Sequence, residues 1–253
     1  EPTTSAALDL VLPRQEQVLY SLDVGERGDI VMLLSDHGRD YRLFETTVGS
    51  LPVDPEIIVT SNNNHGNPNP DKVITDMDLF RDYLILYETL TETGYRQITI
   101  QDRSSHHASH AVTVPLSHGK NGPCLQATPA GNICYSATSL RLALETPVAP
   151  PDTFELDFPT STIKPLHQES TEIESWYQQE RVFVPSADGT RVPLSLFYLR
   201  DTEEETSSFS IWNWLARTNQ SSSDSREETS NRPVVLLGYG AYGESVSVGY
   251  DPV

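Results

Sequence analysis

A glycine-rich loop near the end of the sequence carries the residues best suited to chemistry. The apolar run Pro233–Leu237 is followed directly by Gly238-Tyr239-Gly240-Ala241-Tyr242-Gly243. Such a run predicts a buried strand, and α/β folds commonly build a ligand site where a strand ends in a loop of this kind. The phenol of Tyr239 is protonated at neutral pH and can donate a hydrogen bond to the oxyanion of a tetrahedral intermediate. A tight turn with packed tyrosines is the alternative.

Two further patterns are weaker candidates. The histidines His106, His107, His110 and His118 could hold a transition metal, but no cysteine or carboxylate stands beside them at ligand spacing, so a polar loop is favoured and no metal is expected. The sequence contains no Gly-x-Ser-x-Gly elbow. The nearest approach, Ser245–Gly249, lacks the first glycine.

Charge and composition exclude several classes of protein. The 253 residues carry a net charge of -19, which would repel the phosphates of a nucleic acid. Apolar runs of 18 residues are absent, so a membrane-spanning helix is excluded. Cys124 and Cys134 are expected to be free thiols in a reducing compartment, which favours a cytoplasmic protein. The first residue is Glu1 rather than methionine, so we expect the natural N-terminus to lie upstream.

Residues 1–165 are predicted to form part of a β-propeller. Eleven short apolar or β-branched stretches, separated by turn residues, are too many for one sandwich and fit about three blades of 40 to 50 residues each. No repeated residue motif is visible in the sequence. The predicted strands are 7–12, 18–22, 29–34, 41–46, 56–60, 73–80, 83–88, 95–100, 111–116, 133–139 and 153–158.

Residues 166–253 are predicted to begin a second domain. After a polar connector over 159–179, strands at 180–184 and 192–199 flank the turn Ser186-Ala187-Asp188-Gly189. Residues 201–231 are acidic and rich in serine, which indicates a solvated insertion. The overall fold class is mainly β.

Two late segments and several earlier ones resemble the prolyl oligopeptidase family. Residues 181–196 and 233–243 are similar to the family motifs sxDGtxvPxsl and PxllxGYGxyG, which open its α/β-hydrolase domain after a seven-bladed propeller. Residues 76–86 are similar to the segment dxdlFrdxlvl of the oligopeptidase B branch. Looser matches lie at 12–14, 41–44 and 146–156.

The resemblance implies a serine peptidase that cleaves short peptides and needs no cofactor. Tyr239 matches the oxyanion-hole tyrosine, and Tyr242 matches an aromatic residue near the S1 side. The family's Ser, Asp and His lie further along than Val253, so we expect an inactive fragment holding the last blades and the first hydrolase strands. Ser247 and Gly249 occupy the positions of two aspartates that bind basic residues in oligopeptidase B, which leaves cleavage after Arg or Lys open.

Two other functions fit the same residues. One is a non-catalytic propeller that binds peptides as a scaffold, and the other is an esterase- or thioesterase-like relative, because this hydrolase core hosts several acyl-transfer reactions. The expected partners are short peptides, not nucleic acid or membrane, and the oligomeric state is left open.

Overall fold

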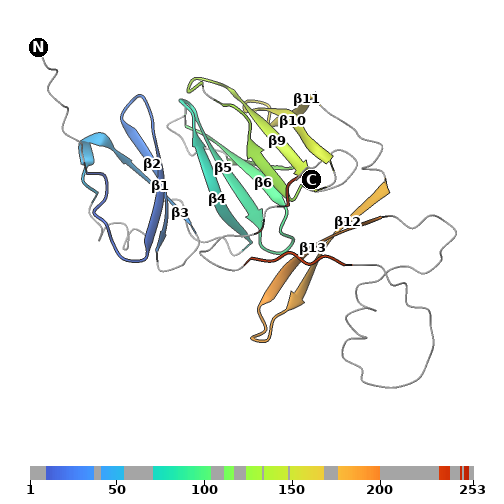
Figure 1. Cartoon of the computed structure of the whole chain (residues 1–253). Helices are drawn as coiled ribbons and strands as arrows, with labels where there is room; N and C mark the ends of the chain where they lie inside the picture. Colours follow the sequence, from blue (N-terminus) through green and yellow to red (C-terminus); the bar gives the residue numbers. More distant parts are fainter. Residues whose placement is uncertain are drawn as a thin grey trace, which may run out of the picture.

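The computed structural model describes most of the chain in separate stretches, and it is almost entirely β-structure (Figure 1). One short 3-10 helix, η1 (Val48–Ser50), is the sole helical element among the described residues. In the part of the chain that is described, no helix has the length and apolar character needed to cross a membrane. The described residues are 10–36, 41–53, 71–103, 111–116, 124–132, 134–147, 149–167, 176–199, 234–239, 246 and 248–250.

Three antiparallel sheets form the body of the molecule. The first has the strand order β1-β2-β3, the second β4-β5-β6-β7, and the third β11-β10-β9-β8. Consecutive strands are therefore neighbours in every sheet, as in a propeller blade. Their bounds are β1 (Val18–Val24), β2 (Asp29–Asp36), β3 (Arg42–Thr47), β4 (Lys72–Leu79), β5 (Tyr83–Leu90), β6 (Arg96–Asp102), β7 (Ala111–Pro115), β8 (Gln126–Pro129), β9 (Ser139–Thr146), β10 (Ala149–Asp157) and β11 (Thr162–His167).

The three sheets repeat with a fixed spacing along the chain. Their first strands begin at residues 18, 72 and 126, which is one sheet every 54 residues. The equivalent residues are Val18, Lys72 and Gln126, so the repeat is one of position and not of residue type. The blade is longer than the 40 to 50 residues expected, and three blades are present as expected.

Apolar side chains on both faces of the inner strands hold the sheets together. On β2, Val31 and Leu33 pack against Leu84 and Leu86 of β5, which joins the first sheet to the second. Ile30, Met32 and Leu34 point to the opposite face and pack against Leu12 and Val53. A strand with neighbours on both sides must be apolar at every position, and this explains the unbroken run Ile30–Leu34.

The second and third sheets share the largest core. Ile85, Ile98 and Ile100 of the second sheet pack against Leu142 and Leu156 of the third. All five side chains are almost fully buried. Burying each such side chain contributes about 2 kcal/mol, so this contact is a main source of the stability of the stack.

Polar bonds tie the first sheet to the second at specific points. The backbone N–H of Leu79 donates to the Asp23 carboxylate at 3.1 Å. Arg103, just beyond β6, forms an ion pair with Asp29 at the start of β2, with 2.7 Å between Nη1 and Oδ2. These bonds fix the register of two sheets that apolar packing alone would let slide.

A two-stranded hairpin follows the third sheet. It consists of β12 (Tyr177–Pro185) and β13 (Arg191–Leu199), which pair along their full length and lie below the second sheet in Figure 1. Gly189 has a φ of +86°, the conformation that the predicted Asp-Gly turn requires. The hairpin prediction is therefore confirmed.

Several strand predictions were wrong. Residues 10–12 of the predicted strand 7–12 are not a strand, although Leu12 is buried. Described residues of 133–138 form turns, and β9 starts only at Ser139. The predicted connector 159–179 contains the strand β11. Its side chains are mostly exposed, so this strand is held by backbone pairing with β10 and not by apolar burial. The predicted strand 56–60 lies outside the described residues.

Candidate functional site

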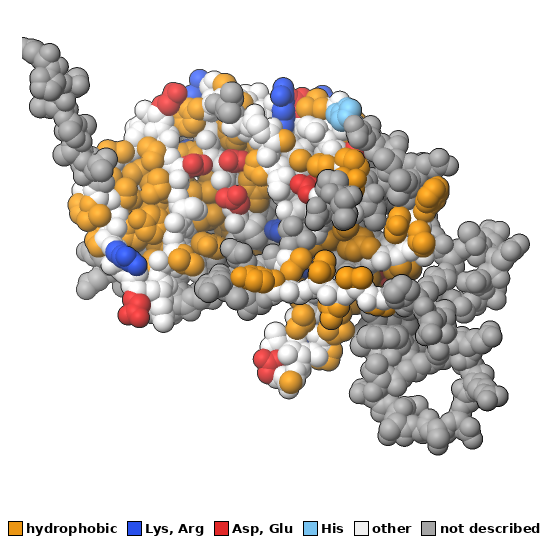
Figure 2. All heavy atoms as spheres, viewed as in Figure 1, with side chains coloured by type: hydrophobic (Ala, Val, Ile, Leu, Met, Phe, Trp, Pro, Cys, Tyr) orange, Lys and Arg blue, Asp and Glu red, His pale blue; other side chains and the backbone are white. Residues whose placement is uncertain are grey.

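The apolar segment before the glycine-rich loop is exposed. Val234, Val235, Leu236 and Leu237 are 72%, 85%, 80% and 77% exposed, and residues 234–239 form no strand. The prediction of a buried strand was wrong because burial requires partner strands, and none pairs with this segment among the described residues. Figure 2 shows apolar side chains in a row where Figure 1 draws this segment in red.

Tyr239 lies at the end of this segment and is 53% exposed. Its phenol is therefore accessible to a ligand, as an oxyanion donor must be. Tyr242, the second residue named by the sequence motif, lies outside the described residues, as do residues 201–231 and the histidines 106–110 and 118. The roles of both tyrosines stay predictions. Among the residues described, no three His, Cys, Asp or Glu side chains come together as metal ligands.

The hairpin contacts the second sheet through Arg181 and Gly94. Gly94 lies in the turn between β5 and β6 with a φ of +72°, and its N–H donates to the carbonyl of Leu90 at 2.7 Å. A Cβ atom at Gly94 would stand 2.7 Å from Nη2 and 2.8 Å from Nε of Arg181. The guanidinium of β12 thus lies directly against the glycine of the blade, and only a residue without a side chain permits this approach.

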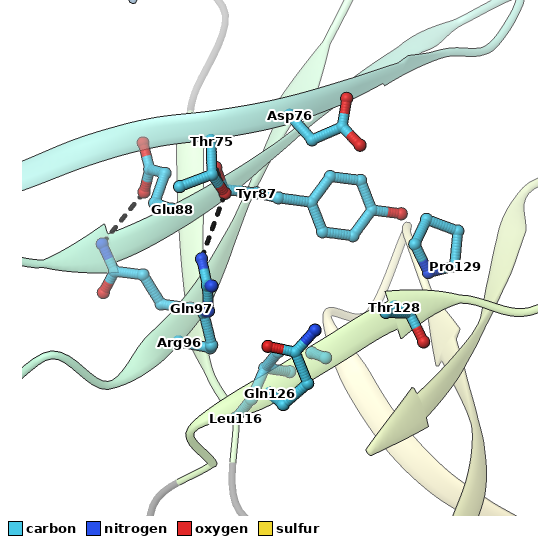
Figure 3. Close-up of a pocket in the computed structure, with 11 residues that line it drawn as sticks. Thr75, Asp76, Tyr87, Glu88, Arg96, Gln97, Leu116, Gln126, Thr128 and Pro129 are labelled. Atoms are coloured by element: carbon cyan, nitrogen blue, oxygen red, sulfur yellow. Dashed lines mark hydrogen bonds between the residues drawn. The ribbon is translucent and has the colours of Figure 1, made fainter. Parts of the chain in front are cut away.

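A polar pocket of about 230 Å³ opens between the second and third sheets (Figure 3). Its walls come from β4, β5 and β6 on one side and from β8 on the other. Arg96, Tyr87 and Gln126 surround the hollow, and Asp76 lies beside Tyr87. Sequence reasoning missed this pocket because its residues are spread over 55 positions and no motif connects them.

Arg96 is the cationic group of the pocket. Its Nη1 donates to Thr89 Oγ1 at 2.5 Å and to Thr75 Oγ1 at 3.2 Å, and its Nε donates to the carbonyl of Leu125 at 3.3 Å. Burial lowers the pKa of Arg96. Its hydrogen-bond partners are all neutral, and the carboxylates that line the same pocket are those of Asp76 and Glu88.

The neighbouring Glu88 is fully partnered. Its carboxylate accepts from Gln97 Nε2 at 2.9 Å and from Thr99 Oγ1 at 2.7 Å, and Lys72 Nζ lies 2.8 Å from Oε1. Its side chain is 2% exposed. A buried carboxylate needs such a set of donors. Glu88 therefore acts as a structural group and leaves no negative charge free for a ligand.

Acidic side chains gather over β4 on the face shown in Figure 2. The phenol of Tyr87 donates to Asp78 Oδ2 at 2.6 Å. Burial is the main reason that the pKa of Asp78 is raised, and the charges of Asp76 and Asp23 raise it further. The pKa of Tyr87 is also raised, by burial first and then by the Asp78 charge. Tyr87 therefore stays a hydrogen-bond donor throughout the physiological pH range.

The fold is that of propeller blades seen in solved oligopeptidases. Oligopeptidase B from Trypanosoma brucei, solved in a closed form with covalently bound antipain, is similar over 95% of this chain with a TM-score of 0.63 and 18% identity. Oligopeptidase B from Leishmania major is similar over 79% of the chain, with a TM-score of 0.60 and 17% identity. A post-proline cleaving enzyme from Rickettsia typhi is similar over 73%, with a TM-score of 0.52 and 13% identity.

The chain spans only part of these proteins. It covers 30%, 28% and 26% of their respective lengths. No protein-family model matches the chain, and no curated protein matches it either. At these identities the likeness establishes the fold, and function has to be argued from residues.

Proposed function

We propose that this chain is part of a serine-type oligopeptidase of the prolyl oligopeptidase family, similar to oligopeptidase B. The observation that carries the proposal is the likeness to oligopeptidase B over 95% of the chain. The motif-bearing residues 181–196 lie on that hairpin, and 233–243 include the exposed Tyr239. Residues 1–165 would form propeller blades and residues 166–253 the start of the α/β-hydrolase domain.

In this proposal Tyr239 supplies one donor of an oxyanion hole. A serine activated by a histidine, which an aspartate orients, attacks the peptide carbonyl, and the phenol hydrogen-bonds to the oxygen as negative charge develops on it. Tyr242 would contact the substrate near its S1 residue. In this proposal the triad comes from residues outside the 253, and the 253-residue chain by itself is expected to be inactive.

The substrates would be short peptides, which a propeller admits while excluding folded proteins. Free thiols at Cys124 and Cys134 are consistent with a reducing, cytoplasmic location. Cleavage after basic residues is the specificity that the oligopeptidase B branch suggests. The positions Ser247 and Gly249 do not supply the two aspartates that would reinforce it.

The test is to sequence the transcript past the codon of Val253 and to assay the longer product. We expect a serine elbow followed by an aspartate and a histidine, and hydrolysis of a fluorogenic short-peptide amide ending in arginine. The same peptide as an ester and as a thioester gives the comparison. Faster turnover of the thioester with no amide cleavage would instead support an esterase- or thioesterase-like enzyme. Peptide binding without turnover would support a non-catalytic scaffold.

A further inference from the structure

A short loop of the third sheet reaches past the second sheet to the first. Residues 134–138, which we call the strap, lie between β8 and β9. The half-buried ring of Tyr135 in the strap packs against the apolar core between the first and second sheets. In stacked repeats each unit contacts only its neighbours. A tyrosine of the third repeat that packs on the core of the first two is therefore an exception to the stacking.

Backbone hydrogen bonds hold the strap on both sides. The N–H of Arg81, in the turn between β4 and β5, donates to the carbonyl of Tyr135 at 2.8 Å. At the other end of the strap, the N–H of Phe158, just beyond β10, donates to the carbonyl of Thr138 at 2.9 Å. The strap is therefore fixed to the third sheet and laid over the turn of the second, and this places the ring of Tyr135.

The phenol of Tyr135 ends against the first sheet at Gly25. Gly25 lies in the turn between β1 and β2, and a Cβ atom there would stand 2.5 Å from Oη of Tyr135 and 2.1 Å from Oδ1 of Asp29. Only a residue without a side chain leaves room for this approach. Burial and then the charge of Asp29 raise the pKa of Tyr135, in agreement with the contact. Parts of all three sheets thus meet at one point.

This point lies at the opposite end of the second sheet from the hairpin. Arg81 precedes β5, whereas Gly94, which Arg181 of the hairpin contacts, follows it. The eight residues of β5 span about 27 Å in an antiparallel sheet. The second sheet is therefore tied to the hairpin at one end and to both neighbouring sheets at the other.

Ion pairs at the same end join the first sheet to the second. Arg103 is paired with Asp29 at 2.7 Å, and Arg27 is paired with Asp82 at 3.5 Å. Neither of these pairs includes a residue of the third sheet. The packing of Tyr135 is what adds the third sheet to this junction.

We infer that the strap is a releasable tie, which holds the three sheets together as one unit while Tyr135 is seated and lets the first sheet open locally from the second when Tyr135 leaves. Proteins open locally, in units that often coincide with supersecondary motifs, without unfolding as a whole. A ring that is only partly buried leaves its seat at a lower cost than a fully buried core side chain. The tie rests on contacts among the three sheets and is independent of the proposed peptidase function.

The test is amide hydrogen exchange, resolved by NMR on the 253-residue chain. Two amides report on the strap: that of Arg81, bonded to the carbonyl of Tyr135, and that of Gly25, bonded to the carbonyl of Asp29 at 2.8 Å. Tyr135→Ala should raise the exchange rates of both about tenfold or more, because it removes the ring that holds the first sheet. The amides of β12 and β13 should be unchanged, which shows that the chain is folded. Unchanged exchange at Arg81 and Gly25 would overturn the inference.

Tyr83→Ala is the matched control for the loss of a tyrosine ring. Tyr83 is also partly buried, but it packs against the core between the second and third sheets. Its substitution should leave the exchange of the Gly25 amide unchanged. A rise at Gly25 as large as that in Tyr135→Ala would show a general loosening and contradict the tie. Tyr135→Phe keeps the ring and should retain the protection of both amides.

Gly25→Ala reaches the strap from the first sheet, and it serves also if Tyr135→Ala fails to fold. Its methyl group would collide with the phenol of Tyr135 and the carboxylate of Asp29, so exchange at Arg81 should rise. Gly49→Ala is the control, because the nearest atom to a Cβ at Gly49 is 4.0 Å away and neither glycine has a positive φ. Equal exchange at Arg81 in the two variants would contradict the contact.

A double variant tests whether the two residues act through each other. In the Tyr135→Ala background the added effect of Gly25→Ala should shrink, because one of the two groups that the methyl meets is gone. Strictly additive effects on exchange at Arg81 would place Tyr135 away from Gly25 in solution and overturn the inference.

Discussion

The guanidinium of Arg181 on the hairpin lies against the α-carbon of Gly94 on the second sheet. A methyl group at Gly94 would stand 2.7 Å from Nη2 and 3.1 Å from Cζ of Arg181, closer than side chains pack. Through this contact the hairpin, which is the start of the proposed peptidase domain, touches the second sheet.

Gly94→Ala should destabilise the protein more than a positive φ alone explains. The φ of +72° costs an alanine about 1 to 2 kcal/mol, and the clash with Arg181 adds to this. Gly131→Ala is the matched control, because Gly131 has a φ of +67° but no atom within 4 Å of its Cβ position. Urea unfolding should show a greater loss for Gly94→Ala, and equal losses would mean that Arg181 does not press on Gly94 in solution.

Arg103→Gln should weaken the joint between the first and second sheets. The ion pair with Asp29 is short, at 2.7 Å, and its side chains are 19% and 21% exposed, so we expect a loss of about 1 to 3 kcal/mol. Arg27→Gln removes a longer pair with Asp82, at 3.5 Å, in which the arginine is 66% exposed, and should cost less than about 1 kcal/mol. The free energies of unfolding of the two variants make the comparison. A greater loss for Arg27→Gln would contradict the interface described.

The two cysteines should differ sharply in reactivity. Cys134 is exposed, and its hydrogen bonds with Ser136 lower the pKa of its thiol. Cys124 is buried, and burial raises the pKa of its thiol to about 11. Because the thiolate is the reactive form, iodoacetamide at pH 8 should label Cys134 quickly and Cys124 only after unfolding. Mass spectrometry of the labelled peptides checks this, with Cys134→Ser as the control in which fast labelling disappears.

Sequence patterns predicted strands such as β2, β5 and β6 that bury apolar side chains, but they missed β9, where Leu140, Leu142 and Leu144 are fully buried. The run Ile30–Leu34 alternates between two cores, and both cores exist because sheets or loops cover both faces of β2. The pattern could not find β11, whose residues are polar and exposed and which is held to β10 by the backbone. The sequence pattern also could not show that a new sheet begins every 54 residues, because equivalent positions hold residues as different as Val18 and Lys72.

The candidate site was predictable only in part. The glycine-rich loop indicated Tyr239, and that side chain is accessible. The exposure of Val234–Leu237 was not predictable, because a strand's own residues do not determine whether other strands are present to cover it. The pocket beside Arg96 carried no signal either, since its lining residues lie between positions 75 and 129 and only the folded chain brings them together.

Tyr239→Phe should reduce catalysis in the longer gene product without destabilising it. An oxyanion donor acts in the transition state, so kcat should fall roughly a hundredfold while KM changes little. The side chain is half exposed, so loss of its hydroxyl should leave the unfolding transition in place. Tyr250→Phe is the control outside the loop. A kcat for Tyr239→Phe equal to that of Tyr250→Phe would remove Tyr239 from the proposed site.

Hydrolysis of one fluorogenic arginyl peptide amide, measured side by side for the 253-residue chain and for the product of the longer transcript, tests the central claim most directly. We predict no turnover by the 253-residue chain and turnover by the longer product that a serine-directed phosphonate abolishes. Amide hydrolysis by the 253-residue chain alone, or a longer product that binds the peptide but never cleaves it, would contradict the assignment to the serine oligopeptidases.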